Sequence, residues 1–314
     1  MNKGLVIKTT GNRYTVKFNN EIIHCALRGK FKTKGFRTTN PIAVGDFVGF
    51  DFEEDKLQGV IKKIYERKNF LTRKSTNLSK KSHIIAANID FAIILITITK
   101  PITYPMFIDR FLIACEANNI EAILVFNKVD IYNEDDFLQL KNYKEIYSNI
   151  GYKCLDISVK ENKNIDKFKT LIKDKTIAIS GNSGVGKSSL INLLEPGLKL
   201  KTMEISDYHE QGKHTTTFTE MHKIGNAYVI DTPGVRGFGL DSIEREDLSL
   251  FFPEMNKLKN TCKFNNCTHT HEPECAIKLA VENGSINKLR YKNYISIFND
   301  EDDKHRMDKY NILA

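Results

Sequence analysis

The sequence lacks any apolar run long enough to cross a bilayer. Its longest such run is FAIILITIT (91–99), whereas a membrane-spanning helix needs about 20 residues. The N-terminal segment MNKGLVIKTTGNRY likewise has no apolar stretch of signal-peptide length. These two absences predict a cytoplasmic protein without a membrane partner.

Cysteine is also sparse, with six residues among 314. Because disulfides are rare in cytoplasmic proteins, these cysteines are expected to be thiols or metal ligands. Hydrophobic residues make up 41% of the chain and charged residues 27%, which is typical of a globular protein and not of a disordered one. The length allows two or three domains.

Positive charge is concentrated at the N-terminal end. Residues 1–77 contain 16 Lys and Arg against 7 Asp and Glu, a net charge of +9, whereas the remainder contains 31 and 32. Such a surplus is either a lysine-rich solvated surface or an electrostatic surface for the phosphates of nucleic acid. Composition alone does not decide between the two.

The first 70 residues predict short strands separated by turns. Five stretches are rich in Val, Ile, Tyr and Phe: GLVIKTT, RYTVKFN, EIIHCALR, DFVGFDF and GVIKKIYE. About five strands in this length predict a small barrel, either of the OB type or SH3-like, since the two patterns are nearly the same. The basic loop from Lys30 to Pro41 suits contact with nucleic acid.

From residue 84 the pattern alternates between strands and helices. Predicted strands are FAIILITIT, EAILVFNKVD, YKCLDISVK, KTIAIS and AYVIDTPG, and predicted helices are PMFIDRFLIACEANN and NIDKFKTLIK. This alternation predicts an α/β fold with a mostly parallel, doubly wound sheet that binds ligands at the carboxyl ends of its strands. After Leu240 a Cys/His cluster is flanked by two helical segments, and this region is too small to bury much core, so a bound metal ion would help to stabilise it.

GNSGVGKSSL (181–190) is a phosphate-binding loop between a predicted strand and a predicted helix. Main-chain N–H groups and the helix N-terminus are expected to hold the phosphates. Lys187 would neutralise the outer phosphates, and the Ser188 hydroxyl would bind Mg²⁺. The predicted nucleotide-binding residues of this loop are Gly181, Asn182, Ser183, Gly184, Val185, Gly186, Lys187, Ser188 and Ser189.

NKVD identifies the base as guanine. The Asp130 carboxylate can accept hydrogen bonds from both the ring N–H and the exocyclic NH₂ of guanine, and adenine offers no such pair. Asn127 and Lys128 would support the loop and pack on the base, with Val129 between them and Asp130. Ser158, at the end of the next strand, begins an SVK tripeptide that could add a main-chain donor to the guanine carbonyl oxygen.

Two further segments complete the predicted site. In DTPG (231–234), Asp231 would lie beside the Mg²⁺ shell, and the Gly234 N–H would meet the terminal phosphate. One of Thr215, Thr216 and Thr217 is expected to complete the Mg²⁺ shell; Thr216 is taken as the candidate, although the sequence does not separate the three.

These segments occur in an unusual order. The base-reading, phosphate, threonine and DxxG segments start at 127, 181, 215 and 231, whereas the usual order begins with the phosphate loop and ends with base reading. Joining the usual termini and cutting after DxxG produces this order without moving a strand in space. The sequence therefore predicts a circular permutation whose loops still converge on one nucleotide.

A basic barrel, a permuted GTPase with NKVD, GNSGVGKS and DTPG, and a C-terminal Cys-x4-Cys-x-His-x5-Cys pattern resemble the ribosome small-subunit-dependent GTPase A (RsgA) family. The resemblance covers essentially the whole chain; Val159 departs from it, because such GTPases usually carry Ala there. It implies a circularly permuted P-loop GTPase domain with an N-terminal OB-like β-barrel and a C-terminal zinc-binding helical domain. The expected boundaries are 1–72, 73–240 and 241–314.

The resemblance also implies an activity and a partner. The chain would be a monomeric GTP hydrolase that binds the small ribosomal subunit and its rRNA with GTP during late assembly. The subunit would stimulate hydrolysis, and the protein would leave with GDP. Two other interpretations are a nucleotide-gated RNA-binding module with little turnover, and an ATPase or kinase that uses the same phosphate loop; Asp130 argues against the second.

In the Cys/His cluster, Cys262, Cys267, His269 and Cys275 supply a Cys3His set for one structural Zn²⁺. His271 is an alternative to His269, and the family spacing selects His269. Buried thiols beside a chance histidine would be the simpler explanation. The other cysteines, Cys25, Cys115 and Cys154, lie in predicted strands or a helix and are expected to be core thiols.

The group that positions the attacking water is missing from its usual place. Ras-like enzymes use a glutamine directly after DxxG, and this chain has Val235 there. Slow intrinsic hydrolysis is therefore expected. His214, before the threonines, is the catalytic candidate because it can orient water or accept its proton; an exposed loop histidine without a role is the alternative.

Overall fold

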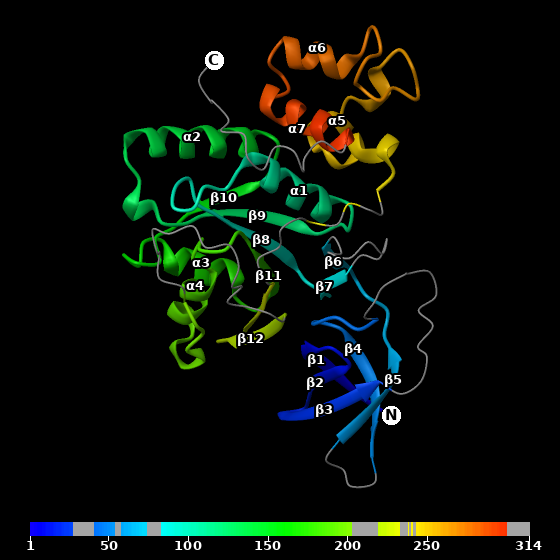
Figure 1. Ribbon diagram of the computed structural model, residues 1–314, viewed down its shortest axis with the longest axis vertical. Coiled ribbons are helices and arrows are strands. Elements are labelled where there is room, and N and C mark those ends of the chain that lie inside the picture. The colour runs from blue at the N-terminus through cyan, green and yellow to red at the C-terminus, as the bar shows by residue number, and fades with distance from the viewer. Residues whose placement is uncertain are drawn as a thin grey trace.

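The computed structural model describes residues 1–27, 41–53, 58–73, 83–202, 219–232, 238, 240 and 243–299. A β-barrel lies at one end of the molecule, an α/β layer in the middle and a group of short helices at the other end (Figure 1). Across the described residues, no helix combines the length and the apolar character that a bilayer crossing requires.

The N-terminal barrel has five strands: β1 (Asn2–Thr10), β2 (Arg13–Phe18), β3 (Glu21–Leu27), β4 (Phe47–Phe52) and β5 (Gln58–Ile64). Their order is β1-β2-β3-β5-β4, and β4 pairs with β1 to close the barrel. The chain passes from β3 across to β4 and returns to place β5 parallel to β3. This Greek-key connection is that of the OB-fold, so the structure decides between the two predicted barrels.

The central sheet has the order β10-β9-β8-β11-β13-β12. Neighbouring strands from β10 to β13 are parallel, and only β12 runs antiparallel to its neighbour. The strands are β8 (Phe91–Ile96), β9 (Glu121–Phe126), β10 (Lys153–Asp156), β11 (Thr176–Ser180), β12 (Glu220–Ile224) and β13 (Ala227–Asp231). The predicted doubly wound, mostly parallel sheet is confirmed.

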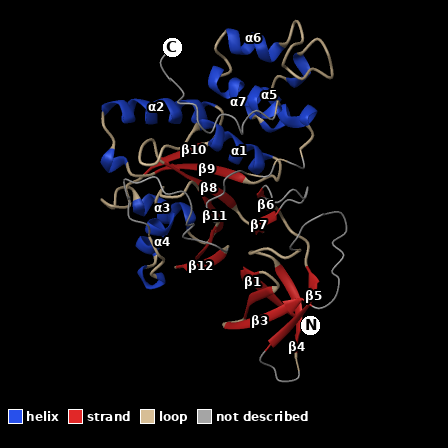
Figure 2. Cartoon of the chain, in the orientation of Figure 1, coloured by secondary structure: helices blue, strands red, loops and turns tan. Residues whose placement is uncertain are grey.

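Helices cover both faces of this sheet, as Figure 2 shows. Because strand side chains alternate, Ile94 and Ile96 of β8 pack in one core with α1 (Pro105–Glu116) and α2 (Glu134–Asn149). Ile93 and Leu95 pack in the other core with α3 (Ile165–Ile172) and α4 (Lys187–Leu194). A strand buried on both faces explains why β8 is a continuous apolar run.

The barrel is joined to the central sheet by a direct strand pairing. β1 pairs antiparallel with β12 at Lys8 and Glu220, whose side chains form an ion pair of 3.0 Å. Lys17 of β2 donates to the Tyr228 hydroxyl of β13 over 2.9 Å. A two-stranded sheet, β6 (Phe70–Arg73) and β7 (His83–Ala87), lies between the two parts in sequence and was not predicted.

The C-terminal region consists of short helices around a small core. Its elements are η3 (Arg245–Phe251), α5 (Pro253–Asn256), η4 (Lys259–Thr261), α6 (Ala276–Glu282) and α7 (Lys288–Phe298), and η1 (Val129–Ile131) and η2 (Pro196–Leu198) are the other 3-10 turns among the described residues. Cys275 belongs to this core, and Cys262 and Cys267 pack against it. Both helices predicted from the flanking segments are present.

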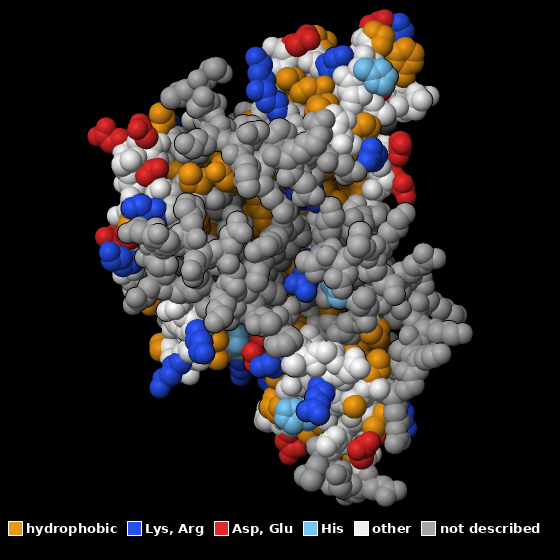
Figure 3. Space-filling view, in the orientation of Figure 1, with side chains coloured by type: hydrophobic (Ala, Val, Ile, Leu, Met, Phe, Trp, Pro, Cys, Tyr) orange, Lys and Arg blue, Asp and Glu red, His pale blue; other side chains and the backbone are white. Residues whose placement is uncertain are grey.

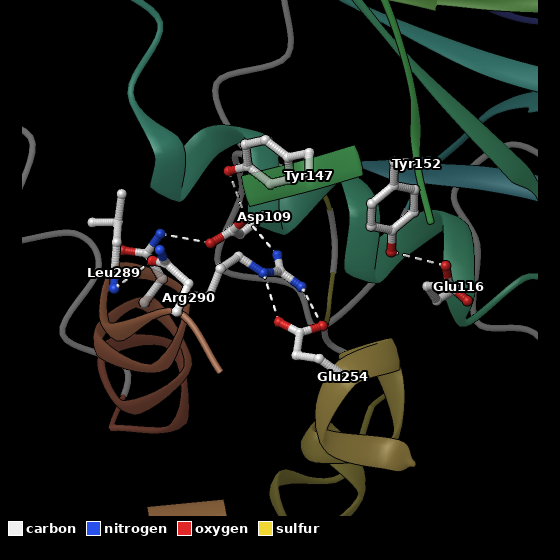
Figure 4. Close-up of polar contacts among 9 residues, drawn as sticks. Asp109, Glu116, Tyr147, Tyr152, Glu254, Leu289 and Arg290 are labelled. Atoms are coloured by element: carbon white, nitrogen blue, oxygen red, sulfur yellow. Dashed lines mark hydrogen bonds and ion pairs between the residues drawn. The ribbon is translucent and has the colours of Figure 1, made fainter. Parts of the chain in front are cut away.

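A buried charge network joins this region to the central layer (Figure 4). Arg290 of α7 is 1% exposed. Its guanidinium bonds to the Asp109 carboxylate of α1 at 2.5 Å and to the Glu254 carboxylate of α5 at 2.8 Å. The Tyr147 hydroxyl donates to Asp109 over 2.9 Å, and Asn293 Nδ2 donates to it over 2.6 Å. Although burial alone lowers it, the two carboxylates raise the pKa of Arg290 above its usual range.

Candidate functional site

The phosphate loop leads from β11 into α4, as the sequence predicted. Gly181 and Gly186 have φ of 149° and 100°, a region that side chains rarely adopt. Space also requires glycine: a Cβ on Gly181 would lie 2.6 Å from the Leu95 oxygen, and one on Gly186 would lie 2.5 Å from Asn127 Nδ2. The spacing of the glycines is thus explained by backbone shape and by close packing against strand β8 and against Asn127, which directly follows β9.

Lys187 lies folded over the phosphate loop. Its Nζ donates to the Gly181 oxygen at 2.6 Å and the Asn182 oxygen at 3.1 Å. Burial lowers the pKa of this lysine, and the nearby Asp231 carboxylate partly opposes that effect. The loop therefore holds a partly desolvated cation beside the first turn of α4, where anions bind most favourably.

The base loop (127–130) follows β9 and contacts the phosphate loop directly. Asn127, 1% exposed, donates from Nδ2 to the Val185 oxygen at 2.8 Å. Its Oδ1 accepts from the Val159 N–H at 3.3 Å, so the same amide also reaches the loop after β10. The Ser158 hydroxyl donates to Asp130 Oδ1 at 2.6 Å and thereby fixes the direction of that carboxylate.

Asp231 is at the same edge of the sheet. It ends β13, is buried, and pairs in register with Ile179 of β11, two residues before the phosphate loop. The structure therefore brings together the base loop, Ser158, the phosphate loop and Asp231. Their convergence is what the circular permutation required, because parallel strands place their carboxyl ends at one edge.

Several predicted site residues lie outside the described part of the chain. They are His214, Thr215, Thr216, Thr217, Gly234 and Val235. Their proposed roles stay predictions.

The C-terminal cluster gathers the four predicted ligands. The ligand atoms of Cys262, Cys267, His269 and Cys275 all lie within 4.8 Å of one another. His269 Nδ1 is 3.5 Å from the Sγ atoms of Cys262 and of Cys275. His271 is outside the cluster, and its Nδ1 lies 2.9 Å from the Thr270 hydroxyl. This set could hold a metal ion.

The loop that carries His269 is fixed from two sides. The Glu272 carboxylate accepts from the Thr268 N–H at 2.7 Å, the Thr268 hydroxyl at 2.6 Å and the Thr270 N–H at 3.0 Å. Although burial raises it, these hydrogen bonds lower the pKa of Glu272 to about 2. The Tyr291 hydroxyl of α7 donates to the His269 oxygen at 2.7 Å. Sequence inspection missed Glu272, whose only signal was its place inside the cluster.

Comparison with known proteins agrees with this geometry. The RsgA GTPase family matches residues 64–241, and the RsgA N-terminal domain matches residues 3–61. A protein of Christiangramia forsetii named small ribosomal subunit biogenesis GTPase RsgA is 50% identical over 312 residues, covering 98% of this chain and 99% of that protein. The protein of the same name in Flavobacterium johnsoniae is 51% identical over 314 residues, with 98% and 96% covered.

The chain belongs to the RsgA GTPase family.

Solved structures of similar proteins have the same fold. YjeQ from Thermotoga maritima superimposes with a TM-score of 0.75 at 37% identity, covering 95% of this chain and 98% of that one. YloQ, described as a circularly permuted GTPase, gives a TM-score of 0.70 at 31% identity, with 97% and 96% covered. This RsgA-family chain is thus a circularly permuted GTPase with an N-terminal OB-type barrel, as predicted.

A segment that sequence inspection did not assign to the site is the loop between β8 and α1. The Lys128 Nζ donates to the Lys100 oxygen at 2.6 Å, and burial lowers the pKa of Lys128 while Asp130 opposes this. A Cβ placed on Gly184 would lie 3.6 Å from Pro101 Cδ. This loop therefore bonds to the base loop and lies close to the phosphate loop. Its residues have no motif, so only the fold reveals the contact.

Proposed function

We propose that this chain binds GTP with Mg²⁺ at the carboxyl ends of its parallel strands, hydrolyses it, and acts in late assembly of the small ribosomal subunit. The observation that carries the proposal is the Asn127 side chain, which ties the base loop to the phosphate loop. A single guanine nucleotide can therefore reach both loops. The partner is supported by the relatives' names, which refer to biogenesis of the small ribosomal subunit.

The roles of the nucleotide contacts follow from their chemistry. Asp130, oriented by Ser158, accepts the two N–H donors of guanine, and Lys187 neutralises the outer phosphates. Main-chain N–H groups of the phosphate loop bind the remaining phosphate oxygens. The proposed contacts are Asn127, Lys128, Val129, Asp130, Ser158, Gly181, Asn182, Ser183, Gly184, Val185, Gly186, Lys187, Ser188, Ser189, Asp231 and Gly234.

Mg²⁺ fits the oxygen donors at this edge. Ser188 lies in the first turn of α4, and Asp231 is the last residue of β13. Mg²⁺ prefers a few such oxygens together with phosphate oxygens and water. Ser188 and, from outside the described residues, Thr216 are the proposed protein ligands; bound Mg²⁺ would neutralise charge that develops on the transferred phosphate.

Zn²⁺ fits the C-terminal cluster. Three thiolates and one imidazole within 4.8 Å are the donor set of a tetrahedral structural zinc site. Four protein ligands leave no position for a reacting molecule, so the ion stabilises the region and takes no part in hydrolysis. The packing of all three cysteines on the core of that region supports this role.

Ribosomal RNA fits the charge of the barrel. Residues 1–77 carry a net charge of +9, and Figure 3 shows Lys and Arg side chains among some acidic ones over the barrel. Each phosphate that the protein neutralises releases counterions, so association with the subunit should weaken steeply as salt rises. Binding that does not respond to salt would argue against RNA as the main contact.

We also propose a location, an oligomeric state and domain boundaries for this protein. We place it in the cytoplasm as a monomer with three parts, 1–72, 73–240 and 241–314. The barrel strands end at Ile64, and the proposed boundary at 72 lies inside β6 (Phe70–Arg73), a few residues beyond the end of the barrel.

His214 and Val235 carry the proposed catalytic behaviour. Valine after DTPG cannot orient water, so we expect slow hydrolysis in the free protein, with stimulation by the subunit. His214→Ala should reduce the stimulated rate if this side chain positions water or accepts its proton. Equal rates for both proteins, with and without subunits, would remove His214 from the mechanism.

Nucleotide competition, repeated with purified small subunits, tests the whole proposal. GTP and GDP should displace a fluorescent GDP analogue, and ATP should not. Phosphate release should accelerate on added subunits and continue for many turnovers. Equal displacement by ATP would contradict guanine recognition, while specific binding without turnover would indicate a nucleotide-gated binding module.

A further inference from the structure

One outward face of the barrel combines two aromatic rings with two lysines. We call Lys3, Phe47, Lys63 and Tyr65 the lysine–aromatic face. Lys3 Nζ lies 4.8 Å from the ring centre of Phe47 and 4.9 Å from that of Tyr65. Lys63 Nζ lies 4.7 Å from the ring centre of Tyr65. The four side chains come from β1, β4, β5 and the residue directly after β5, and therefore form one continuous surface.

Strand pairing holds this surface in place. On β4, Val48 and Phe50 point into the barrel core and are fully buried, so Phe47 and Gly49 point outward. The Tyr65 N–H donates to the Phe47 oxygen at 3.0 Å, which places the two aromatic residues side by side. Lys3 is opposite Gly49 on the neighbouring strand. Phe47 remains 38% exposed although it lies on a rigid strand.

The face has positive charge that nearby acids do not cancel. Asp51, farther along β4, is already paired with the N-terminal amine at 3.3 Å and with Lys62 at 2.8 Å. Within the described part of the chain, neither Lys3 nor Lys63 has a carboxylate partner. Their ammonium groups instead lie over aromatic rings. This contact stabilises a lysine less than a hydrogen-bonded ion pair with a phosphate would.

We propose that the lysine–aromatic face binds unpaired bases of a single-stranded RNA segment. The rings of Phe47 and Tyr65 would stack on bases, while Lys3 and Lys63 would leave the ring faces and meet the adjoining phosphates. This inference rests on the proposed RNA-binding function and assigns it to residues other than those of the basic loop from Lys30 to Pro41. Double-stranded RNA keeps its bases stacked inside the helix, so it cannot use the rings.

RNA fits this face better than a protein does. Alternating aromatic and basic side chains match a strand that alternates planar bases with phosphates. An acidic peptide would satisfy the lysines and leave the rings without planar partners. A basic protein surface would be repelled by both lysines.

The test measures RNA affinity of the full-length protein by fluorescence anisotropy. The probes are a labelled single-stranded RNA of about ten nucleotides and a duplex of the same length. Phe47→Leu and Tyr65→Leu each keep an apolar side chain but remove a ring. Each should weaken single-strand binding by about fivefold or more and change duplex binding little. Phe137→Leu removes a similarly exposed ring from α2 and should have no effect.

A salt series separates stacking from charge. Lys3→Gln and Lys63→Gln should each lower the slope of log affinity against log salt by about one, because each removes one phosphate contact. The two ring variants should keep the slope of the native protein. Thermal unfolding of each variant establishes that the barrel still folds.

The outcomes are distinct. If the ring variants bind single-stranded RNA as tightly as the native protein does, while the lysine variants bind it more weakly, then stacking is wrong. The proposed ribosomal function would not be affected by that result. Displacement of the RNA by polyglutamate at the same charge concentration would also overturn stacking, because charge alone would then account for binding. Native protein that binds neither RNA nor small subunits would contradict the proposed function itself, and this inference with it.

Discussion

The Asn127 side-chain amide donates to the main-chain oxygen of Val185, 2.8 Å away and 58 positions later in the sequence. The same side chain accepts from the Val159 N–H. One buried amide therefore joins the loops that follow β9, β10 and β11. Circular permutation leaves this junction intact, since it alters the order in which loops are connected and not their positions in space.

Replacing Asn127 should weaken nucleotide binding as well as folding stability. Asn127→Ala leaves the buried Val185 oxygen without its donor, which costs about 1–3 kcal/mol of folding stability. The base loop would also lose its attachment to the phosphate loop, so GDP affinity should fall at least tenfold. Titration with a fluorescent GDP analogue and urea unfolding measure the two effects.

Asn69 provides the matched control. Its side chain makes the same kind of paired hydrogen bonds to the main chain of Ile89, both at 2.9 Å, but it lies in the segment before β6. Asn69→Ala should reduce stability by a similar amount and leave GDP affinity unchanged. If both variants lose GDP affinity equally, the special role of Asn127 is wrong.

Arg290 should be the most sensitive charged residue for stability. Arg290→Ala would leave the Asp109 and Glu254 carboxylates buried without their cation, which costs about 3–5 kcal/mol. Lys153→Ala breaks an exposed pair with Glu121 and should change stability by less than about 1 kcal/mol. Urea unfolding followed by circular dichroism compares them, and equal small losses would show that the network contributes little.

The local motifs could be read from sequence because each is a short string with its own chemistry. Asp130 and Lys187 were predicted this way and stay predictions, and the Cys/His set around His269, also predicted this way, comes together in the structure. The Asp109–Arg290 pair could not be, since its partners are 181 positions apart and each looks like an ordinary charged residue in a helix. The β1–β12 pairing was hidden for the same reason, because a single register contact leaves no pattern.

Helix α2 was missed for a different reason. Asn133 and Asp136 form a capping box, in which each side chain accepts from the other's main-chain N–H. That signal was present in the sequence, but it begins only three residues after the end of the NKVD motif. The low apolar content of EDDFLQLKNYKEIYSN also weakens the helical pattern, because α2 buries only a narrow stripe against the sheet.

Glu272 should control how firmly the C-terminal cluster holds metal. Glu272→Gln keeps the size of the side chain and removes the charge that accepts three hydrogen bonds from Thr268 and Thr270. Because residues that orient ligands typically change metal affinity about 10- to 100-fold, Zn²⁺ should pass faster to a coloured chelator. The absorption bands of the Co²⁺-substituted protein report whether the ligand geometry changes.

Glu274 is the control within the same loop. It is exposed and pairs with Lys263, without contacting the main chain around His269. Glu274→Gln should transfer Zn²⁺ at the native rate and keep the native Co²⁺ spectrum.

Removal of the metal by a chelator should lower the unfolding temperature of the native protein, since the three cysteines pack on the core of this region.

His222 lies on β12, which pairs with β1 of the barrel, and it should make the folding stability of the protein decrease at acidic pH. Burial lowers the pKa of His222; the nearby Glu220 carboxylate opposes this effect, and Lys8 adds a smaller lowering. Below about pH 6.5 the unfolded chain takes up a proton there more readily than the folded chain. The stability linked to this group is therefore complete above that pH and is lost as the pH falls through the folded pKa.

Replacing the imidazole by a neutral group tests this sign. The stability of His222→Gln should fall less steeply than that of the native protein between pH 7.5 and pH 5.5, as measured by urea unfolding at each pH. His83→Gln should act in the same direction, because burial and then Arg73 lower the pKa of His83. A His222→Gln curve parallel to the native one would mean that His222 protonates equally in both states, and the acid sensitivity would then have to arise elsewhere.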